Sequence, residues 1–375
     1  MTSDGGLFDA LYARGGAAEQ TGGRAWLQAM LDVEAALARA CAAEALIPAE
    51  AASAITAACR AERFDLGAIA AATADSATPV ISLVAALREA VGEPHASYVH
   101  LGATSQDILD TAAMLVARRA LQPLLADTQA AVAACAALAR AHRATPMAAR
   151  TLLQQAQRST FGLRAAGWMV GLAEAAARLR EIDAGRLAVQ MGGAVGTRSP
   201  QIGARVGSEF GLATPLLPWG AIRVRPAELA AALGVLAGVY AKIARDVALF
   251  AQNEVGELRE GGGPGRGGSS AMAHKRNPVA SVAITAAAMR VPALVATMLQ
   301  AMAQEHERAA GAWQAEWGTL AELLALVGSA AAWGAELLDG LEVDAERMSQ
   351  NAAGLDGELD AIDGLIERAL EGCAA

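Results

Sequence analysis

The chain of 375 residues is poor in aromatic residues, cysteine and histidine. Aromatic residues make up 4 %, and the four cysteines stand far apart, without the close pairs that metal sites use. The five histidines are dispersed as well, so we expect neither a metal nor any other cofactor. The cysteines are interpreted as buried or surface thiols: Cys41, Cys59, Cys135 and Cys373.

The chain also lacks an excess of basic residues. Its net charge is −9, which argues against nucleic acid as a partner and requires a local group of donors for any anionic substrate. No basic and apolar leader is visible in residues 1–10, and the longest uncharged apolar run, Leu323 to Ala335, is interpreted as too short to cross a bilayer. We therefore expect a soluble cytoplasmic protein without a membrane partner.

Apolar residues are abundant and recur with helical spacing. A content of 54 % hydrophobic and 18 % charged residues is typical of a globular chain with a large core. Long periodic stretches cover residues 26–46, 108–140, 161–187 and 279–305, and strand-like alternation is scarce. The clearest seam, with alternating steps of three and four residues, is formed by Leu233, Leu236, Tyr240, Ile243, Val247 and Phe250. The sequence predicts an all-α bundle of long helices.

Three segments are expected along this bundle. Residues 1–105 form an N-terminal helical domain, residues 106–345 a central long-helix domain, and residues 346–375 a short C-terminal helical segment. Because the long helices are rich in alanine, each has little apolar area to bury within one chain. Oligomerisation would supply the missing area.

The segment Arg266–Pro278, with the sequence RGGSSAMAHKRNP, combines glycines, hydroxyls and cations. Glycines within and before it remove backbone restraint, so the loop can open and then order over a ligand. They are Gly261, Gly262, Gly263, Gly265, Gly267 and Gly268. A flexible Gly/Ser linker before a capped helix is the alternative interpretation.

The end of the loop favours a binding role. Asn277 followed by Pro278 fits an N-cap and a first helical residue, which would direct free N–H groups at an anion. Lys275 and Arg276 add positive charge there. The cap, the cations and the paired serines together predict a lid that handles an anion.

A second segment, residues 98–111, contains Thr104 with Asp107 three residues later, which predicts a capping box at a helix start. A plain cap is the default interpretation. The same helix start can also bind a carboxylate through the hydroxyl and N–H groups of Thr104 and Ser105. Nearby His100, taken alone, would more often satisfy a local hydrogen bond than take part in a reaction.

These two segments resemble motifs of the fumarase/aspartase superfamily. Residues 268–278 are similar to its signature loop, Gly-Ser-Ser-x-Met-Pro-x-Lys-x-Asn-Pro, with Ala273 in place of proline. Residues 98–111 resemble the His-x-Gly-x-Thr-Ser-x-Asp region of its adenylosuccinate lyase and carboxymuconate cycloisomerase branches. The resemblance implies a homotetramer around a central multi-helix bundle, with each active site assembled from three subunits.

The resemblance also implies roles for individual residues. Ser269, or else Ser270, is the expected catalytic group that exchanges a carbon-bound proton. The expected substrate-binding residues are His100, Thr104, Ser105, Arg150, Thr151, Gln154, Lys275 and Asn277.

A third segment, residues 149–156, separates the branches. Taken alone it would pass as a helix start leading on through residues 159–162. The lyase branch has a histidine where Leu152 stands and a glutamate partner where Val282 stands, a pair suited to protonating a leaving nitrogen. Both are missing here. The resemblance therefore favours the cycloisomerase branch, whose reacting carboxylate needs no proton, over adenylosuccinate or argininosuccinate cleavage.

The C-terminal third points to the same branch, because residues 252–257, 304–308 and 313–317 resemble cycloisomerase patterns. Glu305, Glu307 and Arg308, placed on one helix, would be simple surface charge partners. Residues 218–224 depart from the family's Pro-Trp-His-x-x-Arg-Asp, with Gly220 and Val224 in place of histidine and aspartate.

The expected activity is a cofactor-free conversion of a small di- or tricarboxylate, 3-carboxy-cis,cis-muconate, to a lactone in the protocatechuate branch of aromatic catabolism. Two alternatives remain open. One is an adenylosuccinate-type or other superfamily lyase, and the second is a non-catalytic helical homologue. A nucleotide-phosphate loop is disfavoured, because Gly-x-x-x-x-Gly-Lys-Ser/Thr is absent and no strand pattern precedes the glycines.

Overall fold

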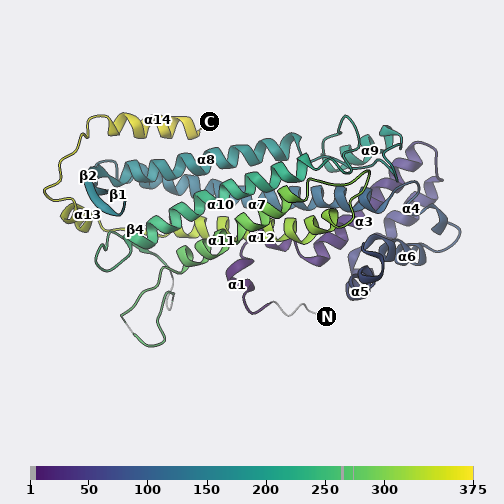
Figure 1. Cartoon of the computed structure of the whole chain (residues 1–375), viewed down its shortest axis with the longest axis horizontal. Helices are drawn as coiled ribbons and strands as arrows, with labels where there is room; N and C mark the ends of the chain where they lie inside the picture. The colour runs from purple at the N-terminus through teal and green to yellow at the C-terminus, as the bar shows by residue number, and fades with distance from the viewer. Residues whose placement is uncertain (1–5, 263–265, 273, 375) are drawn as a thin grey trace.

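The computed structural model describes residues 6–262, 266–272 and 274–374. Long helices lie side by side and form an elongated bundle (Figure 1). They are α7 (Ser105–Ala141), α8 (Phe161–Gly185), α10 (Val224–Phe250), α11 (Val279–Gln300) and α12 (Ala312–Asp339). The predicted seam is confirmed, because every one of its six side chains on α10 is buried. The prediction of a mostly helical long-helix fold is confirmed as well.

Shorter helices gather at one end of the bundle, on the right in Figure 1. They are α3 (Gly23–Ala43), α4 (Ala49–Ala58), α5 (Leu66–Ser76), α6 (Val80–Val91) and α9 (Pro200–Phe210). The one-turn elements are α1 (Asp9–Tyr12), α2 (Gly16–Glu19), η1 (Ala61–Arg63) and η2 (Ala96–Tyr98). α3 is the amphipathic helix predicted over residues 26–46, displaced by three residues at each end.

Among the described residues, two antiparallel two-stranded sheets stand at the opposite end of the bundle, and the first of them is a hairpin (Figure 1). They are β1 (Pro146–Thr151) with β2 (Gln154–Thr160), and β3 (Leu258–Glu260) with β4 (Leu341–Val343). The chain ends with α13 (Ala345–Asn351) and α14 (Ile362–Ala374), and α14 returns to pack on α8.

The first hairpin corrects one prediction. Residues 149–156 form the turn and inner strands of β1–β2, and not a helix start. Leu152 and Leu153 occupy the two turn positions with φ of 50° and 65°, the left-handed conformation that a tight hairpin turn requires. The helix begins only at Phe161, where the Thr160 hydroxyl accepts the N–H of Leu163. The pairing of β1 with β2 therefore decides the conformation of residues 149–156, against the helix start that their sequence suggested.

The expectation that no segment could cross a bilayer was wrong by length and composition. Within the described residues, four helices, α7, α10, α11 and α12, are long and apolar enough to do so by these two criteria alone. The uncharged run at residues 323–335 is shorter than the apolar part of α12, because a membrane-spanning segment tolerates isolated charged residues. In the structure these helices pack on one another within the bundle.

Apolar side chains also remain exposed along the bundle. A groove of about 620 Å³ runs between α8 and α10 and is lined by Gly167, Gly171, Val235, Gly238 and Val239, among others. Val235 is 61 % exposed, and on α11 Met289 is 77 % exposed. The chain thus leaves part of the apolar surface of its long helices uncovered.

Candidate active-site residues

The site residues predicted from sequence lie in separate parts of one chain. Thr104 and Ser105 stand at the start of α7, whereas the β1–β2 hairpin with Arg150 follows its end. α7 has 37 residues, which corresponds to roughly 55 Å at 1.5 Å per residue. The loop between β3 and α11 leaves the bundle at the hairpin end (Figure 1). A single chain therefore does not bring these groups together.

The base of the signature loop is closed by Asn277. Its N–H donates to the Gly267 carbonyl at 2.8 Å, and its amide Nδ2 donates to the Gly267 and Gly268 carbonyls at 3.1 and 3.4 Å. Gly267 has a φ of 70°, and a Cβ there would lie 2.5 Å from the Asn277 carbonyl oxygen. Only glycine allows this closure. Asn277 thus shapes the loop through its side chain.

Asn277 is not the N-cap, which corrects the prediction. α11 begins at Val279 with Pro278 as its N-cap residue. The Glu260 carboxylate accepts the N–H groups of Ala280 and Ser281 at 2.9 and 2.8 Å. The predicted anion site at this helix start is therefore filled by a carboxylate of the same chain.

Ser269 differs from Ser270 in its contacts. The Ser269 hydroxyl oxygen accepts the N–H groups of Ala271 and Met272 at 3.3 and 3.2 Å, which places two donors on this oxygen. Ser270 is exposed. The predicted departure at Ala273 and the glycines at 263 and 265 lie outside the described residues.

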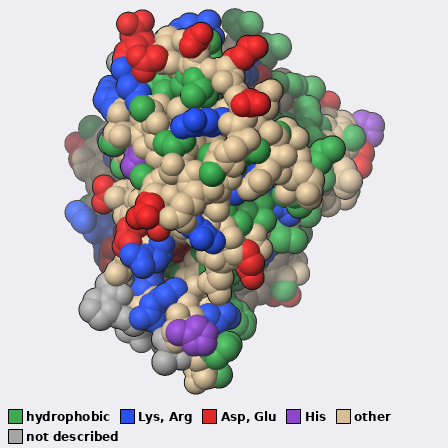
Figure 2. Space-filling view, turned by 90° about the vertical axis from the view of Figure 1, so that its left-hand side faces the viewer, with side chains coloured by type: hydrophobic (Ala, Val, Ile, Leu, Met, Phe, Trp, Pro, Cys, Tyr) green, Lys and Arg blue, Asp and Glu red, His purple; other side chains and the backbone are tan. Residues whose placement is uncertain are grey.

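The loop faces a polar cavity of about 600 Å³. His274, Arg276 and Asn277 line it from the loop, and carboxylates from the β3–β4 region line it from the other side. Figure 2 shows this end of the molecule, where basic side chains and a histidine gather near the bottom of the face. Within the described ranges, no group of three or more His, Cys, Asp or Glu side chains is placed to hold a metal ion.

The hairpin presents its predicted residues differently. Arg150 is paired with the buried Glu257, whereas Thr151 and Gln154 face each other across the turn and are exposed. Leu152 is 97 % exposed at the tip, and Val282 is 54 % exposed on α11. Neither position supplies an acid or a base.

The opposite end of α7 confirms the predicted cap. The Thr104 N–H donates to the Asp107 carboxylate at 3.1 Å, and the N–H groups of Gly192 and Gly193 donate to the same carboxylate at 2.8 and 2.9 Å. Burial raises the pKa of Asp107 to about 6, and these N–H bonds oppose that shift. The glycine-rich segment Gly-Gly-Ala-Val-Gly at residues 192–196 thus docks on the helix start. His100, just before it, has Nδ1 at 2.6 Å from Glu34 Oε1.

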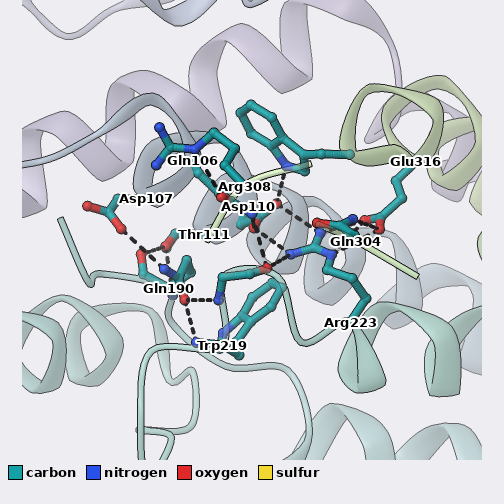
Figure 3. Close-up of polar contacts among 12 residues, drawn as sticks. Gln106, Asp107, Asp110, Thr111, Gln190, Trp219, Arg223, Gln304, Arg308 and Glu316 are labelled. Atoms are coloured by element: carbon teal, nitrogen blue, oxygen red, sulfur yellow. Dashed lines mark hydrogen bonds and ion pairs between the residues drawn. The ribbon is translucent and has the colours of Figure 1, made fainter. Parts of the chain in front are cut away.

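A buried ion cluster, which the sequence reasoning missed, lies beneath this helix start (Figure 3). Arg223 Nη1 lies 2.6 Å from Asp110 Oδ2, and Arg223 Nε lies 2.9 Å from Glu316 Oε1. Trp313 Nε1 donates to Asp110 Oδ1 at 2.9 Å. The sequence did contain a sign of this cluster, because Arg223 and Glu316 lie in the segments 218–224 and 313–317 that were compared with the cycloisomerase patterns. Only the fold shows that they meet.

The same region shows what Gly220 does in place of the family's histidine, and it corrects the prediction of a helix over residues 305–308. Gly220 acts through its backbone, since its N–H donates to Gln190 Oε1 at 3.1 Å and its carbonyl accepts from Arg223 and Gln106. Residues 305–308 lie in the loop between α11 and α12, and not on a helix. Arg308 Nε there donates to Gln106 Oε1 at 3.3 Å, so it is more than a surface charge.

Comparison with known proteins agrees with these motifs. A lyase family model matches residues 14–293. The chain is 47 % identical over 352 residues to 3-carboxy-cis,cis-muconate cycloisomerase of Bradyrhizobium diazoefficiens, covering 92 % of this chain and 76 % of that protein. It is 45 % identical over 365 residues to nitrosuccinate lyase of Streptomyces davaonensis, covering 93 % of this chain and 77 % of that protein.

A solved structure gives the same result. The 3-carboxy-cis,cis-muconate lactonizing enzyme from Pseudomonas putida matches with a TM-score of 0.88 and 39 % identity, covering 98 % of this chain and 87 % of that one. The chain therefore belongs to this lyase family, the fumarase/aspartase superfamily of enzymes that its motifs indicate.

Proposed function

We propose that the protein is a cytoplasmic, soluble 3-carboxy-cis,cis-muconate cycloisomerase that forms a carboxymuconolactone during protocatechuate breakdown. The observation that carries the proposal is the pair of exposed aliphatic residues, Leu152 and Val282, where nitrogen-releasing lyases have histidine and glutamate. A carboxylate that attacks a double bond needs no such proton donor. The identity of 47 % to a cycloisomerase supports the same substrate.

The active unit is a homotetramer in which subunits share each site. The separation of Thr104 from Arg150 along α7 supports this, because one chain cannot place both on one small substrate. The exposed Val235 and Met289 support it as well, since a partner helix would cover them. The domain boundaries stay those expected from sequence, 1–105, 106–345 and 346–375.

The reaction joins a substrate carboxylate oxygen to a carbon of the conjugated diene. The π electrons move toward the neighbouring carbon and its carboxylate, which becomes a dianionic aci-carboxylate. The Ser269 hydroxyl then gives its proton to that carbon, and water restores the hydroxyl. No electron acceptor or carrier group is required, so no cofactor is needed.

The contacts of Ser269 suit this role. Two backbone N–H groups already donate to its oxygen and stabilise the alkoxide that forms when the proton leaves. Loop closure would add exclusion of water and the charge of Lys275. Ser270 remains the second candidate.

The other predicted residues bind the carboxylates. Thr104, Ser105, Lys275 and Asn277 would stabilise the dianion, and they come from the two ends of the bundle. A second set would hold the carboxylates that do not react: His100, Arg150, Thr151 and Gln154.

Nitrosuccinate elimination is a second candidate function. The chain is 45 % identical to a nitrosuccinate lyase, and Gly220 and Val224 depart from the cycloisomerase pattern. Nitrite, like a carboxylate, leaves as a stable anion without a proton. The missing histidine and glutamate are therefore compatible with both reactions.

The test is an ultraviolet assay of the purified protein with 3-carboxy-cis,cis-muconate and, in parallel, with nitrosuccinate. Loss of diene absorbance that Ser269→Ala abolishes and Ser270→Ala retains supports the proposal. Turnover of nitrosuccinate alone would transfer the proposal to the second reaction. A folded protein inactive on both would overturn both.

A further inference from the structure

Glu34 is a buried carboxylate with one described partner. It lies on α3, its side chain is 0 % exposed, and its Oε1 lies 2.6 Å from His100 Nδ1. Its Oε2 atom is buried too and has no hydrogen-bond partner among the described residues. Burying a carboxylate with so few donors is costly. Packing alone does not account for a carboxylate at this position, because an apolar side chain would fill the space without that cost.

His100 is held in an unusual backbone conformation. Its φ is 64°, in the left-handed region, which is a strained conformation for a non-glycine residue. Gly102 follows with a φ of 66°, and the Arg198 guanidinium packs so closely that a Cβ at Gly102 would lie 3.2 Å from it. The backbone turn and the Glu34 contact together fix the imidazole just before the start of α7.

The contact also decides which ring nitrogen is free. An ionised carboxylate only accepts hydrogen bonds, so Nδ1 of His100 must carry the proton that it shares with Glu34. Nε2 is then the ring atom left for a ligand. The His100 side chain is 15 % exposed, which leaves part of the ring accessible.

We propose that Glu34 is a positioning residue of the substrate site: its hydrogen bond keeps a proton on Nδ1 of His100 and holds the ring so that Nε2 faces the substrate beside Thr104 and Ser105, where a substrate carboxylate accepts a proton carried by Nε2 as well. This inference rests on the proposed function for the role of His100. The structure also shows that the chain has a histidine–glutamate pair although the lyase pair is absent. The pair lies at the opposite end of α7 from Leu152.

The kinetic test uses Glu34→Ala, Glu34→Gln, His100→Ala and the double variant Glu34→Ala/His100→Ala. Loss of an orienting partner typically costs 10–100-fold, so Glu34→Ala is expected to raise KM about tenfold while kcat changes less. The double variant should be no worse than His100→Ala, because the two residues act as a unit. A glutamine oxygen can still accept from Nδ1, so Glu34→Gln should restore KM to within about threefold.

Three results would overturn the proposal. They are an unchanged KM in folded Glu34→Ala, additive effects in the double variant, and a Glu34→Gln variant as impaired as Glu34→Ala. Glu44→Ala is the matched control, because it removes a glutamate that pairs with the exposed Arg205 at the end of the same helix. It should leave KM unchanged.

A second measurement does not depend on turnover. Ring nitrogen shifts of protein labelled with ¹⁵N-histidine report the tautomer, and the signal of His100 is the one missing from His100→Ala. The wild-type protein and Glu34→Gln should show a proton on Nδ1 of His100, and Glu34→Ala a mixture of protonated and bare Nδ1. A wild-type His100 ring without a proton on Nδ1 overturns the positioning role even if the proposed reaction fails.

Discussion

The guanidinium of Arg150 donates to both carboxylate oxygens of Glu257, with Nη2 at 2.7 Å from Oε1 and Nη1 at 3.0 Å from Oε2. Glu257 is 0 % exposed, and the Asn351 amide donates to its Oε1 at 2.8 Å. The pair links the first hairpin to the segment before β3 and to α13. Arg150 is thus a structural tie as well as a proposed substrate ligand.

Arg150→Ala is expected to lower the free energy of unfolding by about 3–5 kcal/mol, because it leaves a buried carboxylate without its cation. Denaturant unfolding followed by circular dichroism measures this change. Arg259→Ala is the matched control, because Arg259 pairs with Glu342 on the surface. That pair should contribute little. Equal stability of the two variants would show that Arg150 does not support the fold.

The long helices could be predicted from sequence because their periodicity is strong, and the buried seam on α10 shows it. Residues 149–156 could not, since β1–β2 depends on two left-handed turn residues and on strand pairing. The capping role of Asp107 follows from its spacing to Thr104. Local spacing is visible in a sequence.

Contacts between distant segments are not visible in this way. Arg223 meets Asp110 and Glu316 across three helices, at separations of 113 and 93 residues. Glu260, the last residue of β3, accepts the N–H groups at the start of α11, and the sequence around Asn277 gives no sign of this contact. The resemblance to family motifs identified many of the residues, but packing of the helices decides which hydrogen-bond and ion-pair partners they have.

The buried thiols should resist alkylation. Burial raises the pKa of Cys59 and of Cys135 to about 12, above the ordinary 9.0. A higher pKa means less thiolate at a given pH, and three units correspond to about a thousandfold less at pH 8. Iodoacetamide with mass spectrometry should therefore modify Cys373, which is only half-buried, well before these two.

Unfolding in guanidinium should remove the difference and provides the control. Equal rates of modification of Cys59, Cys135 and Cys373 in the native protein would contradict the burial of Cys59 and Cys135. Between pH 7 and 9 the rate at Cys373 should rise with pH, because the thiolate is the reacting form.

The groove between α8 and α10 should be covered by another copy of the chain. Val235→Glu places a charge among its apolar side chains and is expected to dissociate the oligomer. Sedimentation velocity measures the outcome as a shift toward monomer. Ile81→Glu is the control, because Ile81 is exposed to a similar degree, 57 %, on α6 at the far end. A tetramer retained by Val235→Glu would rule out this groove as the interface.

Thr104 and Ser269 should act from different subunits. The structure separates the start of α7 from the loop at the hairpin end, so one site would take Thr104 from one chain and Ser269 from another. Thr104→Ala and Ser269→Ala should each be nearly inactive alone. Hybrids of the two, formed by mild denaturation and refolding together, should regain roughly a quarter of wild-type activity, because each position is intact in half of the subunits.

Mixing Ser269→Ala with Lys275→Ala is the control for this complementation. Both residues belong to one loop, so every loop in the hybrid carries one of the two changes and no intact site can form. Activity in this control would contradict shared sites. So would an absence of activity in hybrids of Thr104→Ala with Ser269→Ala, once native mass spectrometry has verified their mixed composition. If only the mixture of Thr104→Ala with Ser269→Ala regains activity, the start of α7 in one subunit must meet the loop of another subunit. The length of α7 keeps these two groups apart within one chain, so catalysis needs this contact between subunits.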